Sequence, residues 1–150
     1  TVHSPGWDMH ADGNNPGMVR GMEMLGQTAD QAISTFLEDV AQQGLSKQIL
    51  LVLCGDFGRT PKVNKRGGRD HWARLSTLAF AGGDLQMGQV VGQSASNGGE
   101  PLADPVSLSQ FHATVMHSLI DVGQFRLNTR FPRELADLIE NNQPIGQLTS

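Results

Sequence analysis

The sequence predicts an α/β protein built on a mainly parallel sheet with helices on both faces. The 150 residues suit one ordinary domain. Between Val19 and Ala41, apolar residues recur at spacings of three and four, which predicts one helix. The aliphatic segment 49–53 follows, as is typical of a parallel strand covered on both faces. We therefore expect residues 1–150 to form a single domain.

The first half of the chain has a clear order of elements. Residues 1–16 have the Pro, Gly and Asn content of a loop, and Gly44 is a suitable end for the helix that follows. After the strand 49–53, a basic loop leads to a second predicted strand over 75–81. Residues 88–92 are predicted to form a short peripheral strand.

The second half is predicted to be mainly helical. Residues 93–105 have the composition of a polar loop, and Ser107 can cap a helix. The inner face of that helix is predicted to carry Leu108, Phe111, Val115 and Leu119. Pro132 begins a final helix through about Glu140, and the tail 141–150 is expected to be frayed or irregular.

Composition excludes several classes of function. The net charge of -4 argues against nucleic-acid and anionic-membrane partners, which usually leave a basic face. No apolar run approaches the roughly 20 residues needed to cross a bilayer. The single cysteine, Cys54, excludes an internal disulfide. The chain opens at Thr1 without Met or a signal-peptide pattern, so we expect an excised or mature fragment, and localisation, including export of the parent, stays open.

Cations are concentrated between Arg59 and Arg74. This segment holds six of the eleven Lys and Arg residues against one acid, Asp70, which favours a small anionic substrate. A guanidinium fork suits the oxygens of phosphate or sulfate, so Arg59 and Arg69 are the predicted catalytic residues. Three further cations are expected to steer the substrate electrostatically: Lys62, Lys65 and Arg66. The alternative is a solvated charged loop.

Aspartate and histidine residues flank this segment in a pattern that could hold a divalent metal. Asp oxygens and His nitrogens are the usual ligands in hydrolytic sites. The predicted ligands are Asp8, His10, Asp56 and His71. Asp70 is an alternative ligand or a supporting residue, because adjacent side chains normally diverge. Spacing alone favours a solvated loop whose acids and histidines meet by chance.

Five short motifs carry a resemblance to a known family. They are Gly-Trp-Asp-Met-His at 6–10, Gly-Asp-Phe-Gly-Arg-Thr-Pro at 55–61, Gly-Arg-Asp-His-Trp at 68–72, Ala-Gly-Gly at 81–83 and Phe-His-Ala-Thr at 111–114. In this order they resemble the C-terminal part of a bacterial sulfatase-like family, the domain of unknown function 1501. That family is similar to the alkaline phosphatase and sulfatase superfamily.

The resemblance implies a metal site at the strand ends of a parallel sheet. Asp8 and His10 match the first Asp and His of the superfamily pattern, Asp56 the Asp that ends a strand, and His71 the later His. Phe57 stands where the superfamily has another histidine, which puts a second metal in doubt. The superfamily's nucleophile comes from an N-terminal half that this sequence does not contain.

The resemblance also implies a function. We expect a fragment of a metal-dependent hydrolase of phosphate or sulfate esters, with zinc, manganese or calcium as cofactor. The alternative is a non-catalytic anion-binding or structural module that keeps the fold without the chemistry. The expected partners are a small anionic substrate and either a second copy of the chain or the missing N-terminal half, with no nucleic acid and no membrane.

Overall fold

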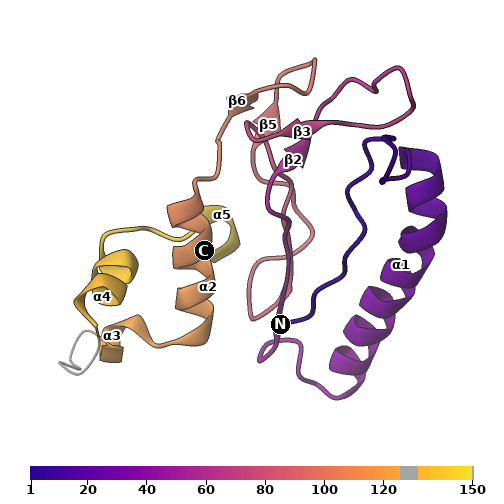
Figure 1. Ribbon diagram of the computed structural model, residues 1–150. Coiled ribbons are helices and arrows are strands. Elements are labelled where there is room, and N and C mark those ends of the chain that lie inside the picture. The colour runs from indigo at the N-terminus through magenta and orange to yellow at the C-terminus, as the bar shows by residue number, and fades with distance from the viewer. Residues whose placement is uncertain (126–131, 150) are drawn as a thin grey trace. The chain divides into compact units, whose positions relative to one another are not determined.

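The computed structural model describes residues 1–125 and 132–149, and these form two compact units (Figure 1). The first unit comprises Thr1–Gly44, Leu53–Ala79 and Ser94–Pro101. The second comprises Leu45–Val52, Phe80–Gln93 and the described part of Leu102–Ser150. Each unit therefore combines segments that are far apart in the sequence.

The first unit consists of one long helix and a short β ribbon. Helix α1, Met18–Gln42, confirms the helix predicted from apolar spacing. Strands β2, Gly58–Arg59, and β3, His71–Trp72, pair antiparallel, with Arg59 opposite His71. The start of α1 is attached to the loop between these strands, because the Met18 amide donates to the Gly67 carbonyl at 3.0 Å.

The second unit is largely helical. Its helices are α2, Leu108–Leu119, α3, Val122–Phe125, α4, Arg133–Glu140, and α5, Gly146–Thr149. Its buried apolar residues are Ala113, Phe125, Ile139, Ile145 and Leu148. The fully buried Thr114 of α2 accepts a hydrogen bond from the Ile145 amide at 2.9 Å, which fixes the chain just before α5. Strand β1, Leu50–Leu53, pairs with β4, Ala79–Gly82, and β5, Gln93–Ser94, pairs with β6, Pro101–Ala103.

The predicted fold class is wrong. Across the described residues every sheet has two short strands, and no large parallel sheet lies between helices. The strand predicted over 75–81 begins only at Ala79, and residues 88–92 form no strand, with Val90 93% exposed. Aliphatic content predicted β1 itself correctly, but a sheet also needs neighbouring strands with free backbone groups, and a short apolar run does not specify those.

Two predictions for the helical half also need correction. The helix cap at Ser107 and the helix over 132–140 are confirmed, and Ser107 forms a capping box with Gln110. However, Leu108 and Leu119 are 68% and 65% exposed, so the predicted inner face of α2 is only partly correct. The tail is not irregular throughout, because α5 forms there and buries Leu148. Packing against Thr114 decided this, since a four-residue helix has little stability of its own.

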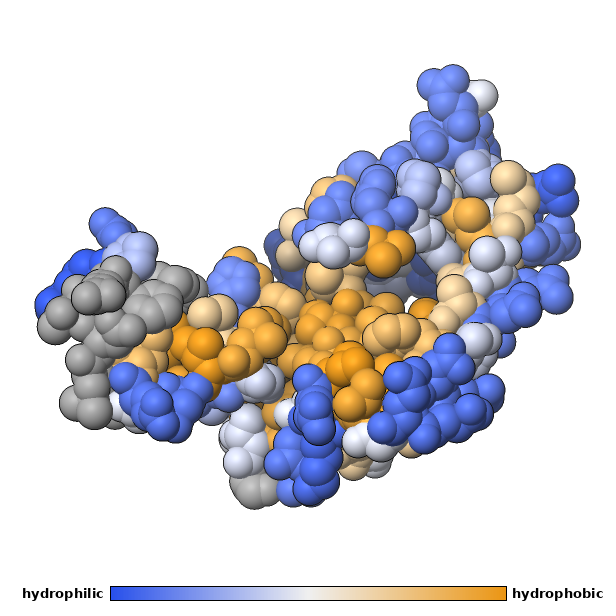
Figure 2. Space-filling view, turned by 90° about the horizontal axis from the view of Figure 1, so that it is seen from below, coloured by the Kyte–Doolittle hydropathy of each residue, from blue (hydrophilic) through white to orange (hydrophobic). Residues whose placement is uncertain are grey.

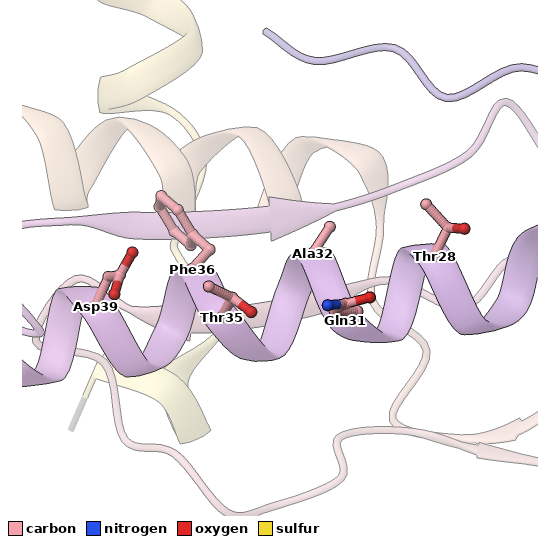
Figure 3. A pocket seen from close by; sticks show the side chains of 6 residues that line it. All are labelled: Thr28, Gln31, Ala32, Thr35, Phe36 and Asp39. Carbon is pink, nitrogen blue, oxygen red and sulfur yellow. The ribbon is translucent and has the colours of Figure 1, made fainter.

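Helix α1 keeps several large apolar side chains at the surface. Val19, Met22, Met24 and Phe36 are each at least 40% exposed. Figure 2 shows one face of the molecule, on which hydrophobic residues are coloured orange. Phe36 also lines an open hollow of about 450 Å³ on α1, together with Thr28, Gln31, Ala32, Thr35 and Asp39 (Figure 3). None of the described helices is both long and apolar enough to span a membrane.

Candidate functional site

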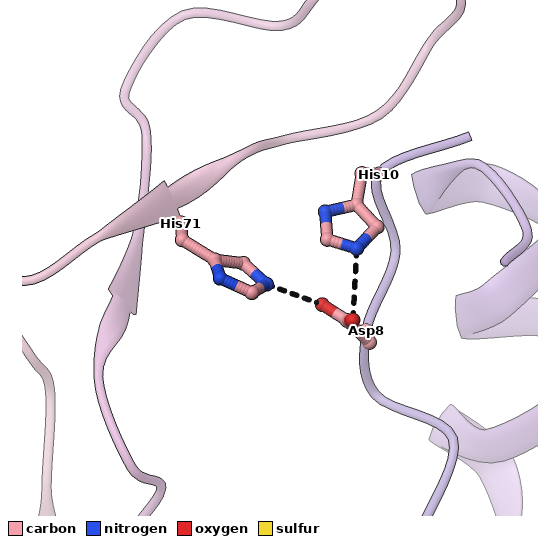
Figure 4. A group of neighbouring side chains, drawn as sticks. All are labelled: Asp8, His10 and His71. Atoms are coloured by element: carbon pink, nitrogen blue, oxygen red, sulfur yellow. Dashed lines mark hydrogen bonds and ion pairs between the residues drawn. The ribbon is translucent and has the colours of Figure 1, made fainter. Parts of the chain in front are cut away.

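Three of the four sequence-predicted metal ligands lie together in the first unit. The ligand atoms of Asp8, His10 and His71 all fall within 4.8 Å of one another (Figure 4). Asp8 is central: its Oδ2 lies 2.8 Å from His10 Nε2, and its Oδ1 lies 3.0 Å from His71 Nε2. We call these three residues, together with Arg59, the Asp8 cluster.

The segment 8–10 is held in place by its backbone. The buried Met9 lies between Asp8 and His10, so alternation along the extended chain lets both polar side chains face the same side. The Met9 carbonyl accepts from the Arg69 amide at 3.0 Å, and the His10 carbonyl accepts from Asn64 Nδ2 at 2.9 Å. The loop between β2 and β3 therefore positions two residues of the cluster.

Arg59 supplies positive charge to the cluster. Its guanidinium forms an ion pair with Asp8, and its side chain is 26% exposed. Desolvation acts to raise the pKa of the Asp8 carboxyl, but hydrogen bonds from His71 and Arg59 and the nearby charges of Arg59 and His10 outweigh it and lower that pKa below 3.8. Asp8 is therefore ionised at neutral pH and can serve as a ligand.

Aromatic contacts fix the rings of the cluster. His10 and His71 stack with centroids 4.8 Å apart, and the Phe57 ring lies 4.4 Å from the His71 ring. The Arg59 guanidinium lies 5.4 Å from the centroid of Phe57. Phe57 cannot ligate a metal, but it contacts both His71 and Arg59 and so restricts their orientations.

Asp56 and Asp70 lie outside the cluster. Asp56 is exposed, and its Oδ1 accepts from the amide of Phe57 at 2.9 Å. Asp70 Oδ1 accepts from Asn64 Nδ2 at 3.1 Å. In this structure neither carboxylate converges with Asp8, and the metal role predicted for Asp56 gains no support from its position.

The two predicted catalytic arginines have different surroundings. Whereas Arg59 pairs with Asp8, the Nη1 of Arg69 donates to the carbonyls of Thr60, at 2.6 Å, and Pro61. Arg69 Nε also contacts the Met18 sulfur at 2.9 Å. Arg69 therefore fastens the loop to the start of α1.

Asn64 is a residue that sequence reasoning missed. Its Oδ1 accepts from the amides of Arg66 and Gly68, each at 3.0 Å, while its Nδ2 donates to His10 and Asp70. The available signal was an Asn shortly before Gly67 and Gly68, because Asn side chains commonly close turns by bonding the backbone two residues on.

The donor set fits a divalent ion such as zinc. A tetrahedral site with bonds of about 2.0–2.1 Å separates its ligand atoms by about 3.3 Å. The distances of 2.8 and 3.0 Å around Asp8 run to its two different carboxylate oxygens, and the ligand atoms of all three residues lie within 4.8 Å of one another. Three protein ligands would leave a position open for water or substrate, the usual arrangement in catalytic zinc sites.

The described residues thus define a protein of helices and short β ribbons, in which Arg59 and His71 of one ribbon form a cluster with Asp8 and His10 of the N-terminal segment. A family model described as "Protein of unknown function (DUF1501)" matches residues 1–131, and the chain belongs to that family. No curated protein and no solved structure matches the chain significantly. The predicted family is confirmed, while membership of the alkaline phosphatase superfamily stays a prediction.

Proposed function

We propose that this chain contributes the metal-binding part of a hydrolase that acts on phosphate or sulfate esters. The observation that carries the proposal is the convergence of Asp8, His10 and His71, from segments about 60 residues apart, on one point beside Arg59. Convergence of an ionised carboxylate with two imidazole nitrogens is the chemistry that divalent metals require.

Each residue of the Asp8 cluster has a distinct role in this proposal. Asp8, His10 and His71 hold the ion, which when bound polarises the ester oxygen and lowers the pKa of a coordinated water. Both imidazoles must present an unprotonated Nε2, so ion binding weakens at acidic pH. When the ion shares the Asp8 carboxylate, Arg59 can turn its guanidinium to the ester oxygens and stabilise their growing charge.

Calorimetric titration of the purified chain with Zn²⁺ or Mn²⁺ alone tests the proposal. We expect Asp8→Asn to weaken binding by about 100-fold, because it removes the anionic ligand at the centre of the cluster. The control is Asp12→Asn, which removes the same charge at an exposed carboxylate 3.9 Å from His10. Absence of binding to the unmodified chain, or equal affinities of the two variants, would refute the metal site.

A second candidate function is anion binding without catalysis. The observation that favours it is the state of Thr60, the hydroxyl nearest to the Gly-Asp-Phe-Gly-Arg motif in the sequence. Its Oγ1 donates to the Lys62 carbonyl at 2.9 Å and accepts from the Asp70 amide at 3.0 Å. Because both hydrogen bonds of this hydroxyl stabilise a turn, it is poorly placed to attack a substrate.

Assays with p-nitrophenyl phosphate and p-nitrophenyl sulfate distinguish the two candidates. Hydrolysis by the metal-loaded chain that is lost in both Asp8→Asn and Arg59→Gln supports the hydrolase. Metal binding with no release of nitrophenol from either ester supports the non-catalytic module for this chain.

A further inference from the structure

Whereas Arg69 donates to backbone carbonyls, three other cations of the first unit make no ion pair and no side-chain hydrogen bond among the described residues. They are Lys62, Lys65 and Arg66, all within the loop Thr60–Asp70, which we call the basic loop. Other cations of the described chain form ion pairs: Arg20 with Glu23, Lys47 with Asp84, Arg59 with Asp8, Arg74 with Glu100 and Arg133 with Asp137. In a chain with 15 acids and 11 bases, this leaves positive charge concentrated in one short segment.

Hydrogen bonds hold the backbone of the basic loop in a defined conformation. The side-chain oxygen of Asn64 accepts hydrogen bonds from the backbone amides of Arg66 and Gly68. The backbone amide of Asn64 donates to the Gly68 carbonyl at 2.8 Å. Thr60 and Arg69 close the base of the loop through the contacts described above. The backbone that carries the lysines is thereby fixed before any ligand arrives, which lowers the entropic cost of binding.

The lysines line a hollow. Its volume is about 340 Å³, and its walls are Thr60, Lys62, Val63, Asn64, Lys65 and Asp70. Asp70 is the only acidic residue that lines the hollow, and its carboxylate accepts a hydrogen bond from Asn64. Two ammonium groups against one carboxylate leave the hollow positive, with Arg66 adding charge from the same loop.

The hollow and the Asp8 cluster have no residue in common. Arg59 and His71 face each other across the ribbon, and the Thr60 amide donates to the Asp70 carbonyl at 2.9 Å as the next pair. Because successive side chains of a strand point to opposite faces, Thr60 and Asp70 point away from the side of Arg59 and His71. An anion in the hollow is therefore separate from one bound at the cluster.

We propose that the basic loop is a second anion-binding site, which holds adjacent acidic groups of an extended ligand with repeated phosphate or sulfate groups. Three cations within five residues suit more than one negative charge, and the fixed loop presents them together. The inference goes beyond the proposed hydrolase and does not require the metal. A linear polyphosphate and a sulfated oligosaccharide share the chemistry that the site recognises.

Calorimetric titration with tripolyphosphate in the presence of EDTA tests the site in the metal-free chain. We expect the double variant Lys62→Gln, Lys65→Gln to bind about tenfold more weakly, because both ammonium groups in the hollow are lost. The matched control is Arg20→Gln, Lys47→Gln, which removes the same net charge from α1 and the second unit and should stay within about twofold. Because EDTA removes divalent ions, tripolyphosphate binding under these conditions does not depend on the metal proposal.

A gain-of-binding variant sharpens the test. Asp70→Asn removes the one acid of the hollow yet keeps an oxygen for Asn64, so we expect about threefold tighter tripolyphosphate binding. A dextran sulfate oligosaccharide, titrated in parallel, shows whether sulfate or phosphate is preferred. The proposal is overturned if the unmodified chain binds neither polyanion, if the lysine and control variants weaken binding equally, or if Asp70→Asn does not tighten it.

Discussion

The Asp8 cluster and the basic loop differ in how the chain builds them. The cluster joins Asp8 to Arg59 and His71, residues 51 and 63 positions away. The basic loop is closed by contacts over four to ten positions, such as Asn64 with Gly68 and Thr60 with Asp70. A local structure needs only its own turn residues, whereas a long-range cluster needs two segments to dock correctly.

The two regions nevertheless share a contact. The segment 8–10 runs against the loop, with Asn64 bonded to the His10 carbonyl and Arg69 to the Met9 carbonyl. Correct folding of the loop is therefore a condition for assembly of the cluster. Two substitutions, each with a matched control, test how strongly the two regions depend on each other.

Gly68→Ala should have the largest effect, because it acts on the shared contact. A Cβ at the buried Gly68 would lie 2.6 Å from the His10 Cα and closer still to the His10 carbonyl, so the backbone of one segment must move. We expect a loss of about 3 kcal/mol in the free energy of unfolding, measured in urea, together with weaker Zn²⁺ and tripolyphosphate binding.

Gly67→Ala is the matched control for that substitution. Gly67 has a φ of +87° and open space around its Cα, so alanine there meets backbone strain without a clash. We expect a loss of about 1 kcal/mol. Equal effects of the two substitutions would contradict the close approach of Gly68 to His10.

Asn64→Ala should have the next largest effect. It removes four side-chain hydrogen bonds, two within the basic loop backbone, one to Asp70 and one to His10. Since each such bond contributes about 0.5–1.5 kcal/mol, and this residue is only half-buried, we expect a loss of about 2 kcal/mol. Thermal unfolding measures it.

Asn97→Ala provides the comparison for Asn64. Asn97 is exposed, and its Oδ1 accepts a single bond from the Gly99 amide at 2.9 Å. We therefore expect Asn97→Ala to lower the free energy of unfolding by less than half as much as Asn64→Ala. If Asn64→Ala lowered tripolyphosphate binding but left Zn²⁺ binding intact, the two regions would be more independent than their contact indicates.

The pH dependence of Asp8 should give the smallest effect and involve the cluster alone. The pKa of Asp8 is lowered on folding, so the stabilisation it gives is fully present above about pH 3.8 and is lost as the pH falls through the lower, folded pKa. Because Asp8 is partly exposed, we expect less than about 1 kcal/mol. The unfolding free energies of Asp8→Asn and the unmodified chain should therefore converge in acid, and a constant difference at all pH values would contradict this assignment.

Local features of the protein could be predicted from the sequence. Apolar spacing predicted α1, aliphatic content predicted β1, and Ser107 predicted the start of α2, because each depends on residues within a few positions. The concentration of cations in the basic loop was equally visible. Family motifs supplied Asp8, His10 and His71 as candidates for one site.

Only the tertiary structure decided which candidates meet. It placed Asp8 between His10 and His71, left Asp56 exposed, and turned Arg69 toward backbone carbonyls while Arg59 reached Asp8. It also limited the described sheets to two strands each. The physical reason is the same in each case: strand pairing and side-chain convergence depend on how distant segments dock, and composition and spacing within one segment do not specify that docking.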